Sequence, residues 1–136
     1  AAKKSGYAGQ FYNVSFVGSK TLADALGKDG TGVAISQVVP FPWSQKTPVV
    51  KEFVALAAKS KADVNFSSLE GFIVAKVFTE GLRRTGKDLT RGNFINALER
   101  SNFDLGGMTV RYSAKSHDGS RFVDLSMYSR DDRFIH

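Results

Sequence analysis

Two prolines placed two positions apart, Pro40 and Pro42, are the feature that most constrains the fold of this chain. Each proline fixes its own φ angle and has no N–H group to donate, so the segment around them is neither helix nor central strand. The β-branched and apolar residues at 33–39 therefore predict a strand that stops at Pro40. A similar segment, 11–17, is followed by a short helical stretch at 21–26. The front of the chain is thus predicted to be a β-α-β unit.

Three amphipathic helices are predicted after the prolines. Thr47 is a suitable N-cap for a first helix over 48–60, which begins with a proline. Ser67 and Glu70 have the spacing of a capping box at the start of the longest helix, which runs to about residue 85. Thr90 is placed to cap a third helix. These helices form the middle of the chain.

The apolar period changes from that of a helix to two after the third helix, which is typical of strands. Two sets of alternating apolar residues mark these strands: Met108, Val110 and Tyr112, and then Val123, Leu125 and Met127. The polar stretch 113–120 is predicted to join them as a hairpin. The order of elements predicts an α/β sandwich with a largely parallel sheet at the front and an antiparallel or edge pair at the end.

The composition is that of one folded domain and argues against several function classes. The 136 residues, 42% of them hydrophobic, suffice for one core but not for two full domains. The net charge is +6, yet Lys and Arg are scattered among acidic residues instead of forming the basic stripe of a nucleic-acid binder. No nucleic-acid partner is expected. The absence of cysteine excludes disulfides, thiol catalysis and Cys-ligated metals.

The sequence contains neither a membrane span nor a signal peptide. No apolar run approaches the roughly 20 residues that a span requires. The first residues, 1–4, lack the apolar segment of a signal peptide. We therefore expect the chain to begin inside a longer one, with any export signal outside it.

Several short motifs along the chain resemble, in their order, those of one known family. They are Phe16-Val17-Gly18-Ser19, Gly32-Val33-Ala34-Ile35-Ser36-Gln37 ending on Pro40, Ser68-Leu69-Glu70-Gly71-Phe72 leading to Gly81-Leu82-Arg83-Arg84-Thr85-Gly86, Phe94-Ile95-Asn96-Ala97-Leu98-Glu99, Phe103-Asp104-Leu105-Gly106-Gly107 and His117-Asp118-Gly119-Ser120-Arg121. Together they resemble the C-terminal part of the leucine/isoleucine/valine-binding type of periplasmic substrate-binding protein of ABC transporters. The resemblance implies a fragment of the two-lobed periplasmic-binding-protein type I fold, an α/β fold with three-layer sandwich elements.

The resemblance also implies how the chain divides between two lobes that hold ligand in the cleft between them. The expected divisions are part of the C-terminal lobe (1–39), a crossing segment (40–46), helices and a strand that complete the N-terminal lobe (47–112), and a further crossing with a tail strand (113–136). The helices would then lack the sheet that they normally cover. Because their apolar stripes need another partner, the fragment is expected to self-associate.

Ser19 and Lys20 are the first candidate ligand-binding residues. They follow the first strand, and α/β sheets bind ligands at the carboxyl ends of their strands. In amino-acid-binding members of the family, an acidic residue at the position matching Lys20 pairs with the ligand's ammonium group. A lysine reverses that sign and favours a ligand carboxylate. The alternative is that Lys20 points to solvent, or that the match is one residue out.

Aromatic residues supply the other candidates. Phe41 and Trp43 could form walls for an apolar ligand, or could simply pack the junction between the lobes. Phe66 and Ser67 stand at the start of the longest helix, whose free N–H groups attract a carboxylate, and family members place a ligand-contacting aromatic residue near there. The alternative for Ser67 is a plain helix cap.

Catalysis is not expected, and neither is a metal or a cofactor. His117-Asp118 would need a serine on a strand-turn-helix elbow, and none of the serines has that setting. Asp118-Gly119 is typical of a turn. Two histidines without cysteine do not suggest zinc, and the glycine-rich segments lack the spacing of phosphate loops.

The resemblance therefore implies a periplasmic solute-binding component of an ABC importer, with no enzymatic activity. Its ligands would be branched-chain amino acids or related small organic carboxylates, including aromatic ones, and its partners would be the membrane permease subunits. The alternative is a ligand-sensing regulatory or receptor domain on the same fold, because a fold does not fix a function.

Overall fold

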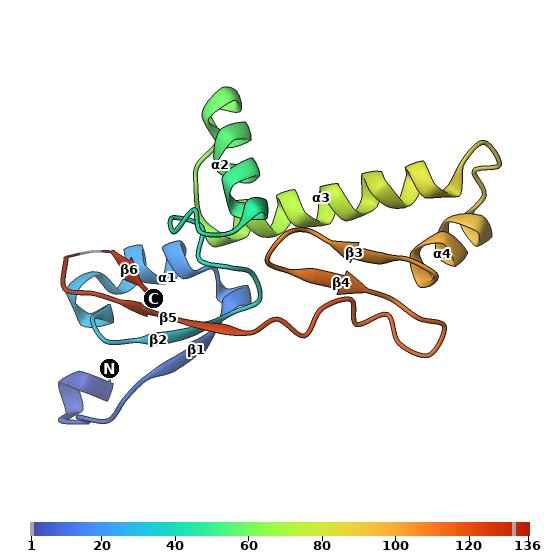
Figure 1. The fold of residues 1–136 in the computed structure, drawn as a ribbon. Helices are drawn as coiled ribbons and strands as arrows, with labels where there is room; N and C mark the ends of the chain where they lie inside the picture. The colour runs from blue at the N-terminus through green and yellow to red at the C-terminus, as the bar shows by residue number, and fades with distance from the viewer. Residues whose placement is uncertain (1, 132) are drawn as a thin grey trace.

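The computed structural model describes residues 2–131 and 133–136, which form two packed parts (Figure 1). One part is a four-stranded mixed sheet with a helix against it, and the other holds three helices and a two-stranded sheet. The segments 38–47 and 112–123 connect the two parts. The predicted α/β class is confirmed. Among the helices described, none combines the length and apolar character that a membrane crossing requires.

The predicted β-α-β unit forms the front of the first part. Its elements are β1 (Tyr12–Val14), α1 (Ser19–Leu26) and β2 (Ala34–Gln37). β1 pairs parallel with β2, as predicted. β1 is shorter than the predicted strand because Ser15–Val17 forms a 3-10 turn. Gly18 then redirects the chain into α1 with a φ of 75°, which glycine adopts without strain.

The two predicted tail strands do not pair with each other, so the hairpin prediction is wrong. β4 (Thr109–Arg111) pairs antiparallel with β3 (Asn102–Asp104), a strand that the sequence pattern did not predict. β5 (Asp124–Tyr128) pairs antiparallel with β2 and then with β6 (Phe134–Ile135). The order in the larger sheet is β1-β2-β5-β6. The polar stretch after β4 therefore connects two sheets instead of closing a hairpin.

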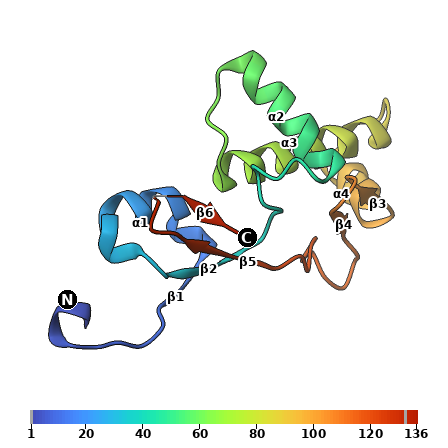
Figure 2. The same ribbon diagram turned by 60° about the vertical axis from the view of Figure 1, so that its left-hand side comes forward.

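The three predicted helices of the second part are α2 (Pro48–Ser60), α3 (Phe66–Thr85) and α4 (Arg91–Glu99). α3 runs alongside the β3–β4 hairpin, and α2 crosses the amino-terminal half of α3 (Figures 1 and 2). Their apolar stripes and the hairpin share one core, which includes Val49, Val50, Phe53, Ala57, Leu69, Ile73, Val77, Phe103 and Val110. Each fully buried Val, Leu, Ile or Phe side chain contributes about 1.5–3 kcal/mol. The stripes expected to lack a partner are thus largely covered within the chain.

The start of α3 differs from the prediction by two residues. Asn65 is the N-cap, and its side-chain oxygen accepts from the backbone N–H of Ser68 at 2.9 Å. The Ser68 hydroxyl in turn accepts from the Asn65 N–H at 3.0 Å, which completes a capping box. Ser67 and Glu70 have similar spacing, but Ser67 lies inside the first turn. At α2 the predicted N-cap Thr47 makes no side-chain cap bond.

Removing this cap is expected to destabilise the chain measurably. Asn65→Ala should cost about 1 kcal/mol of unfolding free energy, because the Ser68 N–H loses its acceptor at the helix end. Ser67 lies two residues further along and is exposed, so Ser67→Ala should change the unfolding free energy by less than about 0.5 kcal/mol. Urea unfolding of both variants measures the difference. Equal effects, or a larger one for Ser67→Ala, would restore Ser67 as the cap.

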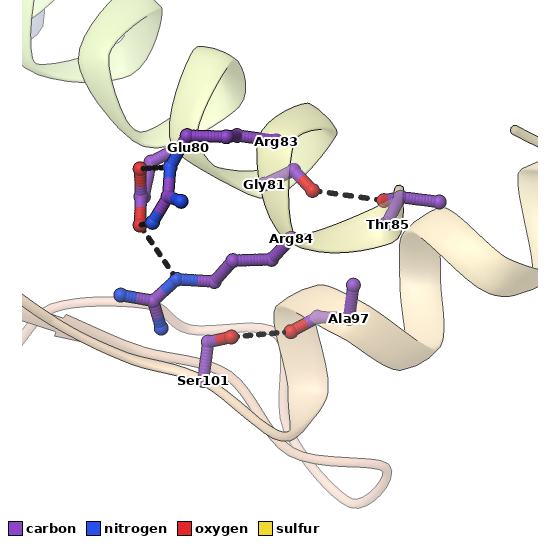
Figure 3. Close-up of polar contacts among 7 residues, drawn as sticks. All are labelled: Glu80, Gly81, Arg83, Arg84, Thr85, Ala97 and Ser101. Atoms are coloured by element: carbon purple, nitrogen blue, oxygen red, sulfur yellow. Dashed lines mark hydrogen bonds and ion pairs between the residues drawn. The ribbon is translucent and has the colours of Figure 1, made fainter. Parts of the chain in front are cut away.

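A charge cluster occupies the carboxyl-terminal turns of α3 (Figure 3). Glu80 accepts from Arg83 at 2.7 and 2.6 Å and from Arg84 at 2.7 Å. The Arg84 guanidinium also lies 4.8 Å from the ring centroid of Phe103 on β3. Hydrogen bonds from Arg83 and then Arg84 hold the pKa of Glu80 well below its ordinary value, at about 2. The cluster ties the end of α3 to the hairpin.

Glu80 is expected to make stability depend on pH in acid. Its folded pKa is about 2 and its ordinary value is 4.5, so its contribution is full above pH 4.5 and is lost as the pH falls towards 2. Glu80→Gln should therefore lose less stability than the wild type between neutral pH and about pH 3. Urea unfolding at the two pH values measures this. Parallel losses in both proteins would show that the cluster has no net effect, as many surface pairs do.

One face of the four-stranded sheet is covered by α1, and the other is open. Gln37 on the covered face is buried and contacts Ser19 of α1. Exposed apolar side chains occupy the open face and its margin: Tyr12, Val14, Val123, Leu125, Met127 and Ile135. The predicted apolar row of the tail strand is therefore exposed, whereas Ser126 within the row and Tyr128 just after it are buried. We call these six residues the open sheet face.

Candidate functional site

The amino-terminal ends of α1 and α3, one from each part, meet at a cavity of about 230 Å³. Its lining residues are Gly18, Ser19, Lys20, Thr21, Trp43, Asn65, Phe66, Ser67 and Phe134. Five of the six predicted ligand-binding residues are among them: Ser19, Lys20, Trp43, Phe66 and Ser67. The structure thus brings together side chains that lie up to 48 positions apart in the sequence.

A second cavity of about 530 Å³ adjoins the first and holds the sixth predicted residue, Phe41. It is lined by Lys20, Ala23, Asp24, Phe41, Trp43, Val64, Asn65, Tyr128, Arg133 and Phe134. Because Lys20, Trp43, Asn65 and Phe134 line both cavities, the two are parts of one hollow between the sheet and the helices. We call this hollow, with the residues that line it, the junction cleft.

Four aromatic rings form one wall of the junction cleft. Trp43 stacks on Phe134 with centroids 6.0 Å apart and an interplanar angle of 9°. Its ring meets Phe41 and Phe66 edge-on, at 5.1 and 5.4 Å. Phe66 is 6% exposed, whereas Trp43 is 43% exposed. The rings therefore pack the junction and also line the cleft, so the two alternatives for Phe41 and Trp43 are compatible.

The two helix ends make the smaller cavity suited to an anion. The first N–H groups of an α-helix have no partner within the helix, and the aligned peptide dipoles give this end a partial positive charge. In α1 these groups belong to residues 19–21. In α3 they belong to Phe66 and Ser67, because the Ser68 N–H is taken by the Asn65 side chain. These five residues line the cavity. A carboxylate between the helices would face both dipoles.

Ser19 is fixed in the cavity wall by a buried hydrogen-bond network. The Gln37 side-chain amide donates to the hydroxyls of Ser19 at 2.9 Å and Ser126 at 2.8 Å. The three side chains are 5%, 1% and 2% exposed, in the order Ser19, Gln37, Ser126. Polar groups so deeply buried are costly unless they are paired, so the network specifies its own geometry.

Lys20 forms an ion pair with Asp24, one helical turn further along α1. The Nζ lies 2.6 Å from the Asp24 carboxylate, and both side chains are 64% exposed. The hydrogen bond and charge of Asp24 raise the pKa of Lys20 above its ordinary value. An exposed pair of this kind is worth little and is easily exchanged, so Lys20 remains able to meet a ligand carboxylate.

Phe134 and Asp24 are cleft residues that the sequence interpretation missed. Phe134 belongs to a two-residue strand, which is too short to leave a periodic pattern. Asp24 left a usable signal, because it stands four residues after Lys20 on a predicted helix and such pairs meet on one helix face. Its carboxylate gives the larger cavity a group of the sign that pairs with an ammonium.

Two other hollows in the described part of the molecule lack such a convergence of groups. A cavity of about 500 Å³ lies between α2, α3 and β3. Its charged lining residues include the Glu52–Lys76 ion pair and the Glu80–Arg84 pair. Another of about 340 Å³, beside α3 and α4, is mostly apolar. The junction cleft differs from both because two helix ends and a buried serine converge on it.

The described residues contain no cluster of three or more His, Cys, Asp or Glu side chains that could hold a metal ion. His117, considered above for catalysis, contacts the Glu99 carboxylate at 2.8 Å and is largely exposed. Ser116 and Asp118 form local turn bonds beside it. These contacts account for the loop in structural terms.

Comparison with known proteins agrees with this architecture. A family model described as periplasmic binding protein matches residues 1–130. No match was found among curated proteins. A possible leucine/isoleucine/valine-binding protein from Rhodopirellula baltica SH 1 has a similar structure, with a TM-score of 0.88 and 28% identity over 99% of this chain. The substrate-binding periplasmic protein from Ralstonia solanacearum gives 0.83 and 29% over 98%.

A branched-chain amino acid ABC transporter protein from Thermus thermophilus, solved with bound valine, aligns over 98% of the chain with a TM-score of 0.79. At 18% identity this likeness shows the fold alone. The chain spans only 38% of the Rhodopirellula protein and 39% of each of the other two. The chain belongs to the periplasmic binding protein family, whose type I fold was predicted from the sequence, and this family consists of solute-binding proteins.

Proposed function

We propose that this chain is the C-terminal part of a two-lobed periplasmic protein that captures a small solute for an ABC importer. In this proposal residues 1–39 belong to the C-terminal lobe, 40–46 form a crossing segment, and 47–112 complete the N-terminal lobe. Residues 113–136 cross back and end in the tail strands. The solute is a branched-chain amino acid or a related organic carboxylate, including aromatic ones.

The observation that carries this proposal is the meeting of two helix ends and an aromatic wall in the junction cleft. Ligand pockets combine apolar and aromatic surface with a few placed polar groups. Trp43 and Phe66 supply the apolar surface, and Ser19, Lys20 and Ser67 supply polar groups. Because these residues come from both parts of the molecule, a bound solute favours the conformation in which the parts are closed. The closed form is the one that the membrane permease subunits would recognise.

A competition experiment on the full-length protein tests the ligand class. Leucine and isocaproate, its deaminated analogue, differ by one ammonium group. Because the ligand ammonium would lie beside the like charge of Lys20, isocaproate should bind at least roughly tenfold more tightly. Lys20→Glu should reverse that preference. Calorimetric titration of each ligand into each protein gives the four constants.

Asp24→Asn is the matched control, since it removes the carboxylate that now shares the lysine. It should leave the preference for isocaproate equal or larger. If leucine binds the wild type more tightly, or if Lys20→Glu leaves the order unchanged, Lys20 does not face the ligand. If neither compound binds, the proposed solute class is wrong.

A further inference from the structure

Gln37 and Ser126 distinguish the hydroxyl of Ser19 from an ordinary buried serine. Ser126 accepts from the Gln37 amide and has the backbone oxygen of Ile35 as an acceptor for its own proton, at 3.5 Å. Ser19 accepts from the same amide, but its proton has no acceptor among residues 2–131 and 133–136. A serine hydroxyl has one proton and accepts through its lone pairs. Because the Ser19 oxygen accepts from Gln37 through one lone pair, its own proton remains available to another acceptor.

The position of Ser19 limits where that acceptor can be. Ser19 is the first residue of α1, is 5% exposed, and lines the smaller cavity. A buried hydroxyl proton without an acceptor is costly, so a ligand oxygen that accepts it in the cavity would be stabilised. Gln37 cannot supply the acceptor, because its amide nitrogen faces Ser19 and its own oxygen has no partner in the described part of the chain.

We propose that Gln37 is a positioning residue that orients Ser19 as a hydrogen-bond donor to the carboxylate of the bound solute. Both amide protons of Gln37 are used, one on α1 and one on β5, so the side chain is held from two sides. The donor role of Ser19 is then built into the sheet and does not depend on the ligand. It adds to the positive ends of α1 and α3 and selects an anionic acceptor over a neutral one. This inference rests on the proposed function and adds to it the residues that select a carboxylate over a neutral group.

The test compares isocaproate with isocaproamide, which has the same carbon skeleton but no charge. Calorimetry on the full-length wild type should show isocaproate binding at least roughly tenfold more tightly, since hydrogen bonds to charged acceptors are about twice as strong as neutral ones. Ser19→Ala and Gln37→Met should each reduce that preference by about fivefold or more. The double variant should bind isocaproate no more weakly than Ser19→Ala, because Gln37 acts through Ser19.

Ser101→Ala is the matched control, since it removes a buried serine hydroxyl that bonds the Ala97 carbonyl of α4, away from the cleft and from Gln37. It should keep the preference within about twofold, and thermal unfolding should show its cost to stability. Equal weakening of both ligands by Gln37→Met, or additive losses in the double variant, would overturn the positioning role. If Gln37→Met fails to fold, an unchanged preference in Ser19→Ala overturns it instead. Absence of binding of either compound to the wild type would reject the proposed function itself.

Discussion

The isolated 136-residue chain is expected to bind isocaproate at least roughly a hundredfold more weakly than the full-length protein does. Pockets for small ligands commonly bury about 70–90% of the ligand surface. The chain spans only 38–39% of the structures that it resembles. Its aromatic wall and two helix ends would therefore meet one side of the solute, and the groups on the other side would be missing.

Calorimetry of both proteins under identical conditions measures this loss. Far-UV circular dichroism and thermal unfolding of the isolated chain serve as the control that it is folded. Binding of isocaproate by the isolated chain at micromolar concentration would contradict the expectation. It would show that the junction cleft is complete within these residues.

Self-association of the isolated chain is the second large effect expected. The open sheet face presents Tyr12 and Val14 of β1, and Leu125 and Met127 of β5, to solvent on either side of β2. Contiguous exposed apolar surface of this kind drives association. Sedimentation should show dimers or larger species at tens of micromolar or thereabouts, and Leu125→Glu should shift them to monomer because it places a charge near the centre of the face.

Val74→Glu is the comparison variant, since Val74 is exposed on α3 and away from the sheet. It should leave the association largely intact. A larger effect of Val74→Glu than of Leu125→Glu would show that the chain associates through its helices, as the sequence alone suggested. A monomer over a wide concentration range in the unmodified chain would count against any such surface.

Local patterns predicted the helices well because each has its own periodicity and boundary residues. Pro48 at the first turn of α2 and Thr90 before α4 stand where the structure places them, and Thr90 accepts from the Asn93 N–H. The cap of α3 was misplaced because two overlapping pairs have similar spacing and only the structure shows that Asn65 bonds Ser68. Strand pairing was the larger error. Alternation identifies the two faces of a strand but not its partner, which is set by distant contacts.

The burial of β5 shows the same limit. The alternation placed Leu125 and Met127 on one face of their strand, yet Ser126 between them is the buried residue, where it accepts from Gln37 of β2. No local pattern records a hydrogen bond across 89 positions. Five of the candidate residues do line one cavity, since Ser19 was chosen at the carboxyl end of a strand and Phe66 at the start of the longest helix, and ligands of such folds bind beyond the carboxyl ends of the strands. Phe134 and Gln37 required the three-dimensional structure.

A crystal structure of the full-length protein grown with isocaproate tests the central claim most directly, namely that the junction cleft is the solute site. The expected result places the carboxylate within about 3 Å of the Ser19 hydroxyl, between the ends of α1 and α3. The branched end should then lie against Trp43 and Phe66. Ligand bound instead in the hollow between α2, α3 and β3, or nowhere near Ser19, would contradict the account.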